Sequence, residues 1–484
     1  MVKKTLSEQI LHILHQNASP SGMERIRLIL LLSFPAIVAQ IASVVMQYID
    51  ASMVGQLGAA DSASIGLVAS SIWLFFSIGM AVNIGFTVLV AQKIGAKNFF
   101  SARNLLKTGF IVSGTVSVIL SLIGIAVSDL LPAWLGGSAE IHDNARNYFL
   151  VVIAGLPVFI LNSLSSGFLQ SSGNMKIPSI LNVAMCVFDV IFNYLFIFPS
   201  HEFSVGTVTL IIPGFDLGVI GAALGTLAAV MLSFSMMLYF LLFKSEKLKL
   251  HKNERFVFSP NLLRKSFLIS APVGFEHVAM CGAMVVSMMI VSPLGTIPIA
   301  THSFAITAES FCYMIGFGIA SAATTLVGQS IGARRTDLAI SFSWMVTGLG
   351  VAFMTVAGIL MFIFAPLMIG MLSPVQEIRE LGADVLRIEA FAEPFYGASI
   401  VISGAVRGAG DTLYPSIFNF VSIWFVRIPL SLILVNLYGF YGVWLAMSIE
   451  LCVRGILFLI HLKRRKWLRG IKLQTNRLQE NIYE

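Results

Sequence analysis

The sequence has 484 residues, of which 57% are hydrophobic and only 11% are charged. A soluble domain carries about 25% charged residues and cannot bury so much apolar surface, so this composition excludes a soluble protein and indicates a chain that lies in lipid. The net charge of +7 is spread over short polar segments without a basic folded face, which gives no support to a nucleic-acid partner.

The first 24 residues precede the first long apolar segment. They contain Ile10, Leu11, Ile13 and Leu14 spaced by polar residues, but not the continuous apolar core of a signal peptide. This pattern fits an amphipathic helix on the membrane surface as well as an unstructured tail. We therefore expect residues 1–24 to form a cytoplasmic tail or a surface helix.

Twelve apolar segments follow, each close to the roughly 20 residues that cross a hydrocarbon layer of about 30 Å. Residues 25–243 form a first lobe with six expected spans, at 28–54, 64–91, 104–128, 147–170, 178–198 and 218–243. A charged cytoplasmic linker, 244–265, leads to a second lobe, 266–462, with spans at 267–292, 299–327, 340–365, 381–406, 414–436 and 441–462. A basic cytoplasmic tail, 463–484, follows. The predicted fold is an all-α membrane protein with twelve transmembrane helices in two pseudo-symmetric six-helix lobes.

The positions of Lys and Arg predict how these spans are oriented, because positive charges collect on the cytoplasmic side of short loops. The two tails and the connections on their side of the membrane carry 26 of the 31 positive residues, whereas the opposite loops carry only Arg146 and Arg379. The sequence therefore predicts a multi-pass protein of the cell inner membrane with both termini in the cytoplasm.

The two lobes repeat each other at a fixed offset of 237 residues. Several segments coincide at this offset: Pro35 with Pro272, 90–96 with 327–333, and 166–182 with 403–419. Because each half has an even number of spans, both halves enter the membrane in the same direction, and such lobes can rock about a central site. The repeat therefore indicates a transporter that opens to one side at a time.

These repeated segments resemble the multidrug and toxic compound extrusion (MATE) family, in the superfamily that also holds lipid-linked oligosaccharide flippases. The resemblance covers residues 25–462. The resemblance rests on three motifs: the pattern from Pro35 to Asp50 with Val54-Gly55-x-Leu57-Gly58, the loop 327–333, and Gly404-x-x-Arg407-Gly408-x-Gly410-Asp411-Thr412-x-x-Pro415. The resemblance implies export of organic, often cationic, compounds, driven by Na⁺ or H⁺ returning down its gradient.

Two carboxylates of the first lobe lie within apolar spans, where an unpaired carboxylate costs at least about 2.5 kcal/mol. Asp50, Asn193 and Thr226 lie at similar depths below the outer ends of their helices, and Asp189 is one turn from Asn193 on the same face. This part of the sequence has no Lys or Arg that could serve as a counter-ion. The four side chains therefore predict a cation site, and either Na⁺ or H⁺ would suit its oxygens and paired carboxyls.

The family resemblance points to the same four positions. The first-lobe cation site of the family has an Asp on the first helix, an Asn and an Asp one turn apart on the fifth, and a Thr on the sixth. Asp50 and Thr226 match this pattern, whereas Asp189 and Asn193 occupy the fifth-helix positions in swapped order. The resemblance thus implies a coupling-cation site with the same set of ligands. Na⁺ is the metal ion that these four residues could hold.

The second lobe carries charged residues of both signs within its apolar spans. Glu309, Glu393 and Arg427 fall near mid-membrane, where Arg427 can neutralise one acid, as a gating pair or as a purely structural one. Glu276 lies nearer the cytoplasmic mouth, where it can contact a cationic substrate or fasten helices. These four residues are the candidates for substrate binding or gating. Glu450 and Arg454, at i and i+4, are expected to form a local ion pair instead.

The sequence thus predicts a secondary antiporter, and not an enzyme, that exports organic, cationic or multidrug-type compounds in exchange for Na⁺ or H⁺. It needs no cofactor besides the coupling ion, and we expect a monomer in the lipid bilayer. A flippase of the same superfamily is the alternative within this fold, but it would favour two further helices and a cavity rich in Arg and Lys. A membrane-embedded enzyme is the alternative of another class; the eight His residues show no spacing of the metal-binding HExxH type.

Overall fold

The long apolar runs form helices, because in lipid the backbone N–H and C=O groups can only bond to each other. The computed structural model describes residues 5–15, 20–205, 208–251 and 254–468. After the short α1 (Leu6–His15), the N-lobe contains α2 (Gly22–Gly55), α3 (Ala59–Gly95), α4 (Phe99–Val127), α5 (Leu131–Trp134), α6 (Ala139–Ala154), α7 (Leu156–Ser171), α8 (Lys176–Ile197), α9 (Gly218–Tyr239) and the π-helical turn η1 (Phe240–Lys244). The C-lobe contains α10 (Pro260–Val291), η2 (Ser292–Leu294), α11 (Thr296–Gly332), α12 (Thr336–Gly370), α13 (Gln376–Ala390), α14 (Glu393–Gly408), α15 (Leu413–Val421), the π-helical turn η3 (Ser422–Arg427), α16 (Ile428–Tyr438), α17 (Phe440–Arg464) and η4 (Lys466–Leu468). The basic tail beyond residue 468 lies outside the described residues.

Ten of the described helices are long and apolar enough to cross a membrane, and α6 with α7 makes an eleventh if this pair, bent by 44°, is one span. The bend falls at Gly155, two residues before Pro157, whose ring cannot continue the hydrogen-bond ladder. The twelfth expected span, 381–406, coincides with α13 and α14. This pair is not among the apolar candidates because it carries several charged side chains, among them Glu389 and Glu393.

The 237-residue offset also relates helix ends in the two lobes. The last residues of α3 and α11 are Gly95 and Gly332, and those of α7 and α14 are Ser171 and Gly408. The broken pair α6 and α7 therefore has its image in the broken pair α13 and α14. The two lobes therefore share this broken span and the ends of these helices.

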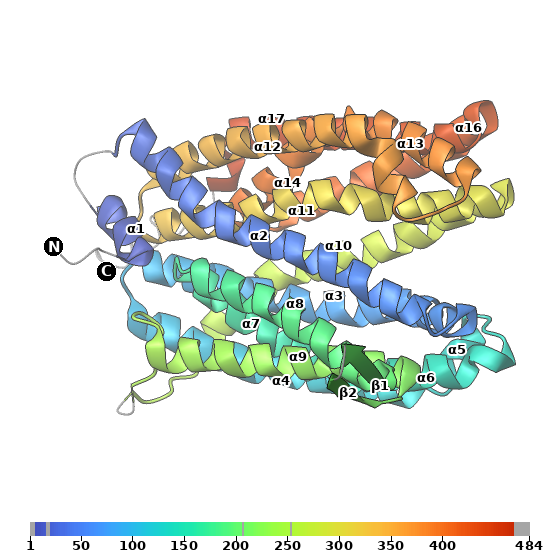
Figure 1. Cartoon of the computed structure of the whole chain (residues 1–484). Coiled ribbons are helices and arrows are strands. Elements are labelled where there is room, and N and C mark those ends of the chain that lie inside the picture. The colour runs from blue at the N-terminus through green and yellow to red at the C-terminus, as the bar shows by residue number, and fades with distance from the viewer. Residues whose placement is uncertain (1–4, 16–19, 206–207, 252–253, 469–484) are drawn as a thin grey trace.

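The lobes meet through the long helices at their centre (Figure 1): α10 packs against α3, and α11 packs against α2 and α3. We call the end of the bundle that carries α1 and the last turn of α17 the near end, and the opposite end the far end. Hydrogen bonds between the lobes cluster in the near half of the bundle, from N-lobe residues 77–92 and 170–171 to the C-lobe segments 270–277, 321–329 and 408. The two lobes are therefore joined toward the near end.

An antiparallel hairpin of β1 (Pro199–Val205) and β2 (Val208–Phe215) connects α8 to α9, and the all-α prediction missed it. Its ladder runs from the pair Pro199 and Phe215 to the pair Val205 and Val208, with an irregularity next to Pro199. The segment has β-branched residues typical of strands, but in so apolar a chain they do not stand out from the neighbouring spans. The hairpin adds a short sheet to an otherwise helical fold.

The helix α1 docks on the near end of the bundle. Its Ile10 and Leu14 are 1% exposed and belong to an apolar cluster that contains residues of both lobes. Ser7 Oγ donates a hydrogen bond to the Ser172 carbonyl at 2.6 Å. In this structure, the apolar face of the amphipathic helix α1 thus packs against the two lobes of the protein itself.

The linker between the lobes is fastened by ion pairing and by a buried amine. Arg103 donates to both carboxylate oxygens of Glu254, and this guanidinium holds the pKa of Glu254 below its ordinary value. Lys247 is buried, and its ammonium donates to the carbonyls of Ser7, at 2.9 Å, and of Ser172, at 3.3 Å. Burial penalises the charged ammonium and lowers the pKa of Lys247 to about 8.

We expect α1 to bind more tightly as the pH rises from about 8 toward about 10.4, the pKa of a lysine in water. In this range Lys247 loses its proton while α1 is docked but keeps it when α1 is detached, so docking no longer buries a charge. A spin label at position 12 should therefore be less mobile at about pH 9.5 than at about pH 7 by electron paramagnetic resonance. The variant Lys247→Met should abolish the pH response, and an unchanged response in this variant would contradict the assignment.

Candidate functional site

Four polar side chains from three helices come together inside the N-lobe. Asp50 lies on α2, Asp189 and Asn193 lie on α8, and Thr226 lies on α9. Asp189 is 0% exposed and Asn193 is 1% exposed. Because α8 packs against both α2 and α9, and because i and i+4 side chains share a helix face, the four residues predicted as a cation site are neighbours in the fold.

The amide of Asn193 joins the two carboxyl groups. Its Nδ2 donates to Asp50 Oδ1 at 2.9 Å and to Asp189 Oδ2 at 3.1 Å. The two Asp side chains lie within hydrogen-bonding reach of each other, and Thr226 lies within reach of Asp189. Two carboxyl groups at such a separation repel each other strongly when both are charged, so either one holds a proton or a cation lies between them.

Two oxygens of this group remain without a donor. Asp189 Oδ1 and Asn193 Oδ1 are buried and have no hydrogen-bond partner. Buried polar atoms are nearly always partnered, so such atoms call for a specific explanation, such as a ligand. Together with Asp50, these oxygens are the atoms that a bound cation could use.

The C-lobe holds a second group of buried acids on four helices: Glu309 on α11, Glu389 on α13, Glu393 on α14 and Glu450 on α17. Each of these side chains is at most 3% exposed. Both carboxylate oxygens of Glu389 and both of Glu393 are buried without a hydrogen-bond partner. A buried charge without a partner costs several kcal/mol, so these two acids are neutral unless a cation lies beside them.

One arginine of this group is fully engaged. Arg454 donates two hydrogen bonds of 2.7 Å to the carboxylate oxygens of Glu450, which confirms the expected i, i+4 ion pair. Its guanidinium also lies over the ring of Tyr396, 5.7 Å from the ring centroid. Arg454 and Glu450 therefore satisfy each other inside the lobe.

The other arginine, Arg427, is shared among several acids. It ends the π-helical turn η3, a feature that sequence patterns do not reveal and that is frequent at functional sites. Its Nη2 donates to the sulfur of Met447 at 2.6 Å, and its charge interacts with Glu309 and Glu389. Since a thioether is a weak acceptor, Arg427 is not held by one strong partner among these contacts.

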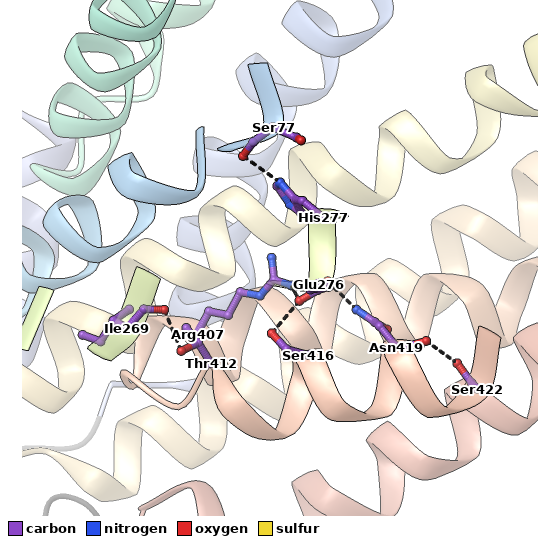
Figure 2. Close-up of polar contacts among 9 residues, drawn as sticks. All are labelled: Ser77, Ile269, Glu276, His277, Arg407, Thr412, Ser416, Asn419 and Ser422. Atoms are coloured by element: carbon purple, nitrogen blue, oxygen red, sulfur yellow. Dashed lines mark hydrogen bonds and ion pairs between the residues drawn. The ribbon is translucent and has the colours of Figure 1, made fainter. Parts of the chain in front are cut away.

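Glu276 is enclosed by donors from the C-lobe (Figure 2). Arg407 Nη2 donates to both carboxylate oxygens at 2.8 Å, and Ser416 Oγ and Asn419 Nδ2 each donate to one of them at 2.7 Å. The side chain of Glu276 is 4% exposed. Each oxygen receives two hydrogen bonds, which stabilises the carboxylate as an anion. The pairing with Arg407 was not foreseen, because the sequence placed that arginine in a cytoplasmic loop.

A family model described as MatE matches residues 35–195 and 272–433, once in each lobe. The chain belongs to the MATE family. As a MATE transporter it is an ion-coupled efflux antiporter and not an enzyme, as the sequence predicted; such antiporters couple to Na⁺ or H⁺. It is a multi-pass membrane protein.

Relatives of this MATE transporter cover almost its whole length. A probable multidrug resistance protein NorM from Thermotoga maritima is 25% identical over 454 residues, 93% of this chain and 94% of the relative. A probable multidrug resistance protein NorM from Photorhabdus laumondii is 26% identical over 457 residues, 92% of this chain and 97% of the relative. These two proteins share the full two-lobe extent of the chain.

Solved structures share its fold. A structure described as the outward-facing conformation of a multidrug resistance MATE family transporter of the MOP superfamily superposes with a TM-score of 0.85 at 20% identity, covering 97% of this chain and 99% of the other. A crystal structure of MATE in complex with MaL6 gives 0.85 at 18% identity, covering 96% and 99%. The predicted two-lobe helical fold is therefore the MATE fold.

Sequence spacing did not single out two residues of the N-lobe group in this transporter. Tyr148, near the middle of α6, interacts electrostatically with both Asp50 and Asp189. The sequence placed Tyr148 at the very start of an expected span, so its depth was underestimated. Gly225 of α9 is the other: a Cβ at this position would lie 2.1 Å from Asn193 Oδ1 and 2.8 Å from its backbone nitrogen. The close approach of α8 and α9 beside Asn193 thus requires a glycine.

We expect Gly225→Ala to lower the free energy of unfolding by about 1 to 3 kcal/mol, because the added methyl group must push Asn193 and α8 aside. Thermal unfolding in detergent measures the change. Gly348→Ala is the matched control, since a Cβ on Gly348 of α12 meets nothing within 4 Å. The control should be as stable as the wild type or up to about 1 kcal/mol more stable; equal destabilisation by both variants would argue against the close approach at Gly225.

Proposed function

We propose that this MATE transporter exports organic cations from the cytoplasm in exchange for protons carried by the pair Asp50 and Asp189. The observation that carries the proposal is the amide of Asn193, whose Nδ2 donates to both carboxyl groups. An N–H group aimed at these oxygens occupies the place where Na⁺ would lie between them. A proton shared by the two carboxyls relieves their repulsion with the amide in place, whereas a Na⁺ ion between them would have to displace this N–H group.

The distribution of charge supports an orientation with the near end in the cytoplasm. Lys and Arg collect in the loops and tails of this end, and positive charges favour the cytoplasmic side. Because the lobes are joined toward the near end, we infer that the structure corresponds to a state closed to the cytoplasm. The similarity to a structure described as outward-facing supports this inference.

The names of the relatives support a drug-like organic substrate, since both are described as probable multidrug resistance proteins. A positive charge on the substrate suits the buried acids of the C-lobe, where Glu309 and Glu393 lie without a fixed ion-pair partner among the described residues. We infer that Arg427 is the movable counter-charge that a cationic substrate replaces. Glu276, whose oxygens are taken by Arg407, Ser416 and Asn419, is better suited to fastening helices than to binding substrate.

The proton-coupling proposal predicts that a pH gradient, and not a Na⁺ gradient, drives a fluorescent cationic dye across sealed vesicles that contain the wild-type protein. Asp50→Asn should abolish this transport, because an amide cannot take up and release a proton at the site. Asp143→Asn, which changes an exposed Asp outside this group, should transport like the wild type. Dye movement driven by a Na⁺ gradient alone would show that Na⁺, and not the proton, is the coupling ion. Transport by Asp50→Asn at the wild-type rate would refute the site.

The two arginines of the C-lobe should differ in what their loss does. Arg454→Met leaves the carboxylate of Glu450 buried without its partner and should cost about 3 to 5 kcal/mol of stability. Arg427→Met removes a charge held by no single acid, so it should unfold near the wild-type temperature while the rate of dye transport falls. Unfolding temperature and transport rate, measured on the same preparations, separate the two roles. Equal losses of stability in both variants would speak against a movable Arg427.

A further inference from the structure

Two glutamines tie the lobes together toward the near end, one from each lobe. Gln92 Nε2 of α3 donates to the carbonyl of Gly408 at 3.1 Å, and Gln329 Nε2 of α11 donates to the carbonyl of Ser171 at 2.8 Å. The two donors are 237 residues apart, and so are the two acceptors. Each inter-lobe bond is therefore the image of the other under the internal repeat.

The backbones of α3 and α11 touch at the same place. A Cβ on Gly95 would lie 2.0 Å from the carbonyl oxygen of Gln329, and a Cβ on Gly332 would lie 1.8 Å from that of Gln92. Only glycine permits such an approach of two backbones. Each glutamine thus bonds to the other lobe by its side-chain amide, and its backbone carbonyl is the surface on which the glycine of the other lobe packs.

An ion pair supports one of the two acceptors. Gly408 follows Arg407, whose guanidinium is bound to Glu276 of α10 as Figure 2 shows. The backbone at Gly408 also lies tightly against α11, since a Cβ there would be 2.5 Å from the carbonyl oxygen of Thr324. The carbonyl that Gln92 uses is therefore held in place from both sides.

The residue next to Glu276 makes a further contact between the lobes. A ring nitrogen of His277, Nδ1, lies 3.1 Å from the carbonyl oxygen of Ser77 on α3 (Figure 2). The helix turn that carries the ion pair thus also touches the N-lobe. Movement of one lobe against the other would act directly on this turn.

The supporting ion pair has no image in the N-lobe. The positions that correspond to Glu276 and Arg407 are Ala39 and Gln170, whereas those of Ser416 and Asn419 are again Ser and Asn. Gln170 Oε1 instead accepts a hydrogen bond from Ser321 Oγ of the C-lobe at 2.7 Å. The two glutamine bonds are alike, but the structures that hold their acceptors are not.

We propose that Gln92 and Gln329 form a paired latch that closes the cytoplasmic gate, and that Glu276 with Arg407 positions the Gly408 carbonyl for one of the two bonds. The proposal rests on the proposed function, which assigns the near end to the cytoplasm and the activity to rocking of the lobes. Opening toward the cytoplasm breaks both glutamine bonds together. The ion pair lies within the C-lobe and moves with it, so it acts only through Gln92.

Distances between spin labels measure the gate without relying on transport. One pair of labels, at Phe100 and Leu413, reports on the near end; a second pair, at Leu130 and Leu437, reports on the far end, and all four side chains are exposed. The full-length protein is examined in lipid nanodiscs by double electron–electron resonance. Gln92→Ala and Gln329→Ala should each raise the ratio of near-end-open to near-end-closed molecules by about fivefold, and the double variant by about twenty-five-fold.

Gln376→Ala is the matched control, because Gln376 is exposed on α13 and takes no part in contacts between the lobes. It should leave both distance distributions unchanged. A double variant Gln92→Ala/Gln329→Ala with wild-type distances would overturn the latch. The predicted rise of the near-end-open fraction in these variants, together with no dye transport by the wild-type protein, would sustain the latch but refute the proposed function.

A double-mutant cycle tests the positioning role of the ion pair. Glu276→Gln should open the near end by the same mechanism as Gln92→Ala, so combining these two should add little, whereas combining Glu276→Gln with Gln329→Ala should add its full effect. The conservative variant Arg407→Lys should keep the wild-type ratio of open to closed molecules, because one nitrogen of Arg407 makes both contacts to Glu276 and an ammonium can replace it. Arg407→Met should behave like Glu276→Gln. If Glu276→Gln combined with Gln92→Ala and with Gln329→Ala to the same extent, or if Arg407→Lys opened the near end as Arg407→Met does, the pair would serve stability alone.

Discussion

A charged side chain in lipid needs a partner, a proton or an ion, because no water is present to solvate it. The two lobes meet this requirement in opposite ways. The N-lobe brings Asp50 and Asp189 together beside uncharged groups, the amide of Asn193, the hydroxyl of Thr226 and the phenol of Tyr148. The C-lobe surrounds its acids with arginines, one of them tightly paired and one shared. What each lobe can bind follows from this difference.

The internal repeat explains why one chain can hold two such different environments. Helix ends, kinking prolines and the crossing of α3 with α11 recur at the 237-residue offset, so the lobes can move as matched bodies. The charged residues do not recur in this way. Glu276 and Arg407 stand where the N-lobe has Ala39 and Gln170, and Asp50 stands where the C-lobe has Ser287. The shared backbone permits the movement, and the unshared side chains make the interiors of the two lobes chemically different.

The sequence was sufficient for the features that depend on hydropathy and spacing. Apolar runs predicted the helices, and the i, i+4 spacing predicted both the pairing of Glu450 with Arg454 and the common face of Asp189 and Asn193. Contacts that depend on three-dimensional crossing were beyond its reach. Arg407 reaches Glu276 across more than a hundred residues, and Tyr148 approaches the Asp pair because α6 packs against α9, the helix that carries Thr226. The hairpin 199–215 and the π turn before Pro429 depart locally from the helical pattern, and hydropathy and helical spacing give no signal for such departures.

The contact of Gly95 and Gly332 with the opposite backbone has a consequence for energy conservation. An antiporter that draws on an ion gradient wastes that gradient whenever ions cross without substrate. A barrier built from charged or hydroxyl side chains can let water files and protons through. Backbone packed against backbone excludes both, whatever the pH or the ionic strength. With the near end in the cytoplasm, as we propose, the two glycines would serve as electrical insulation while the far end is open.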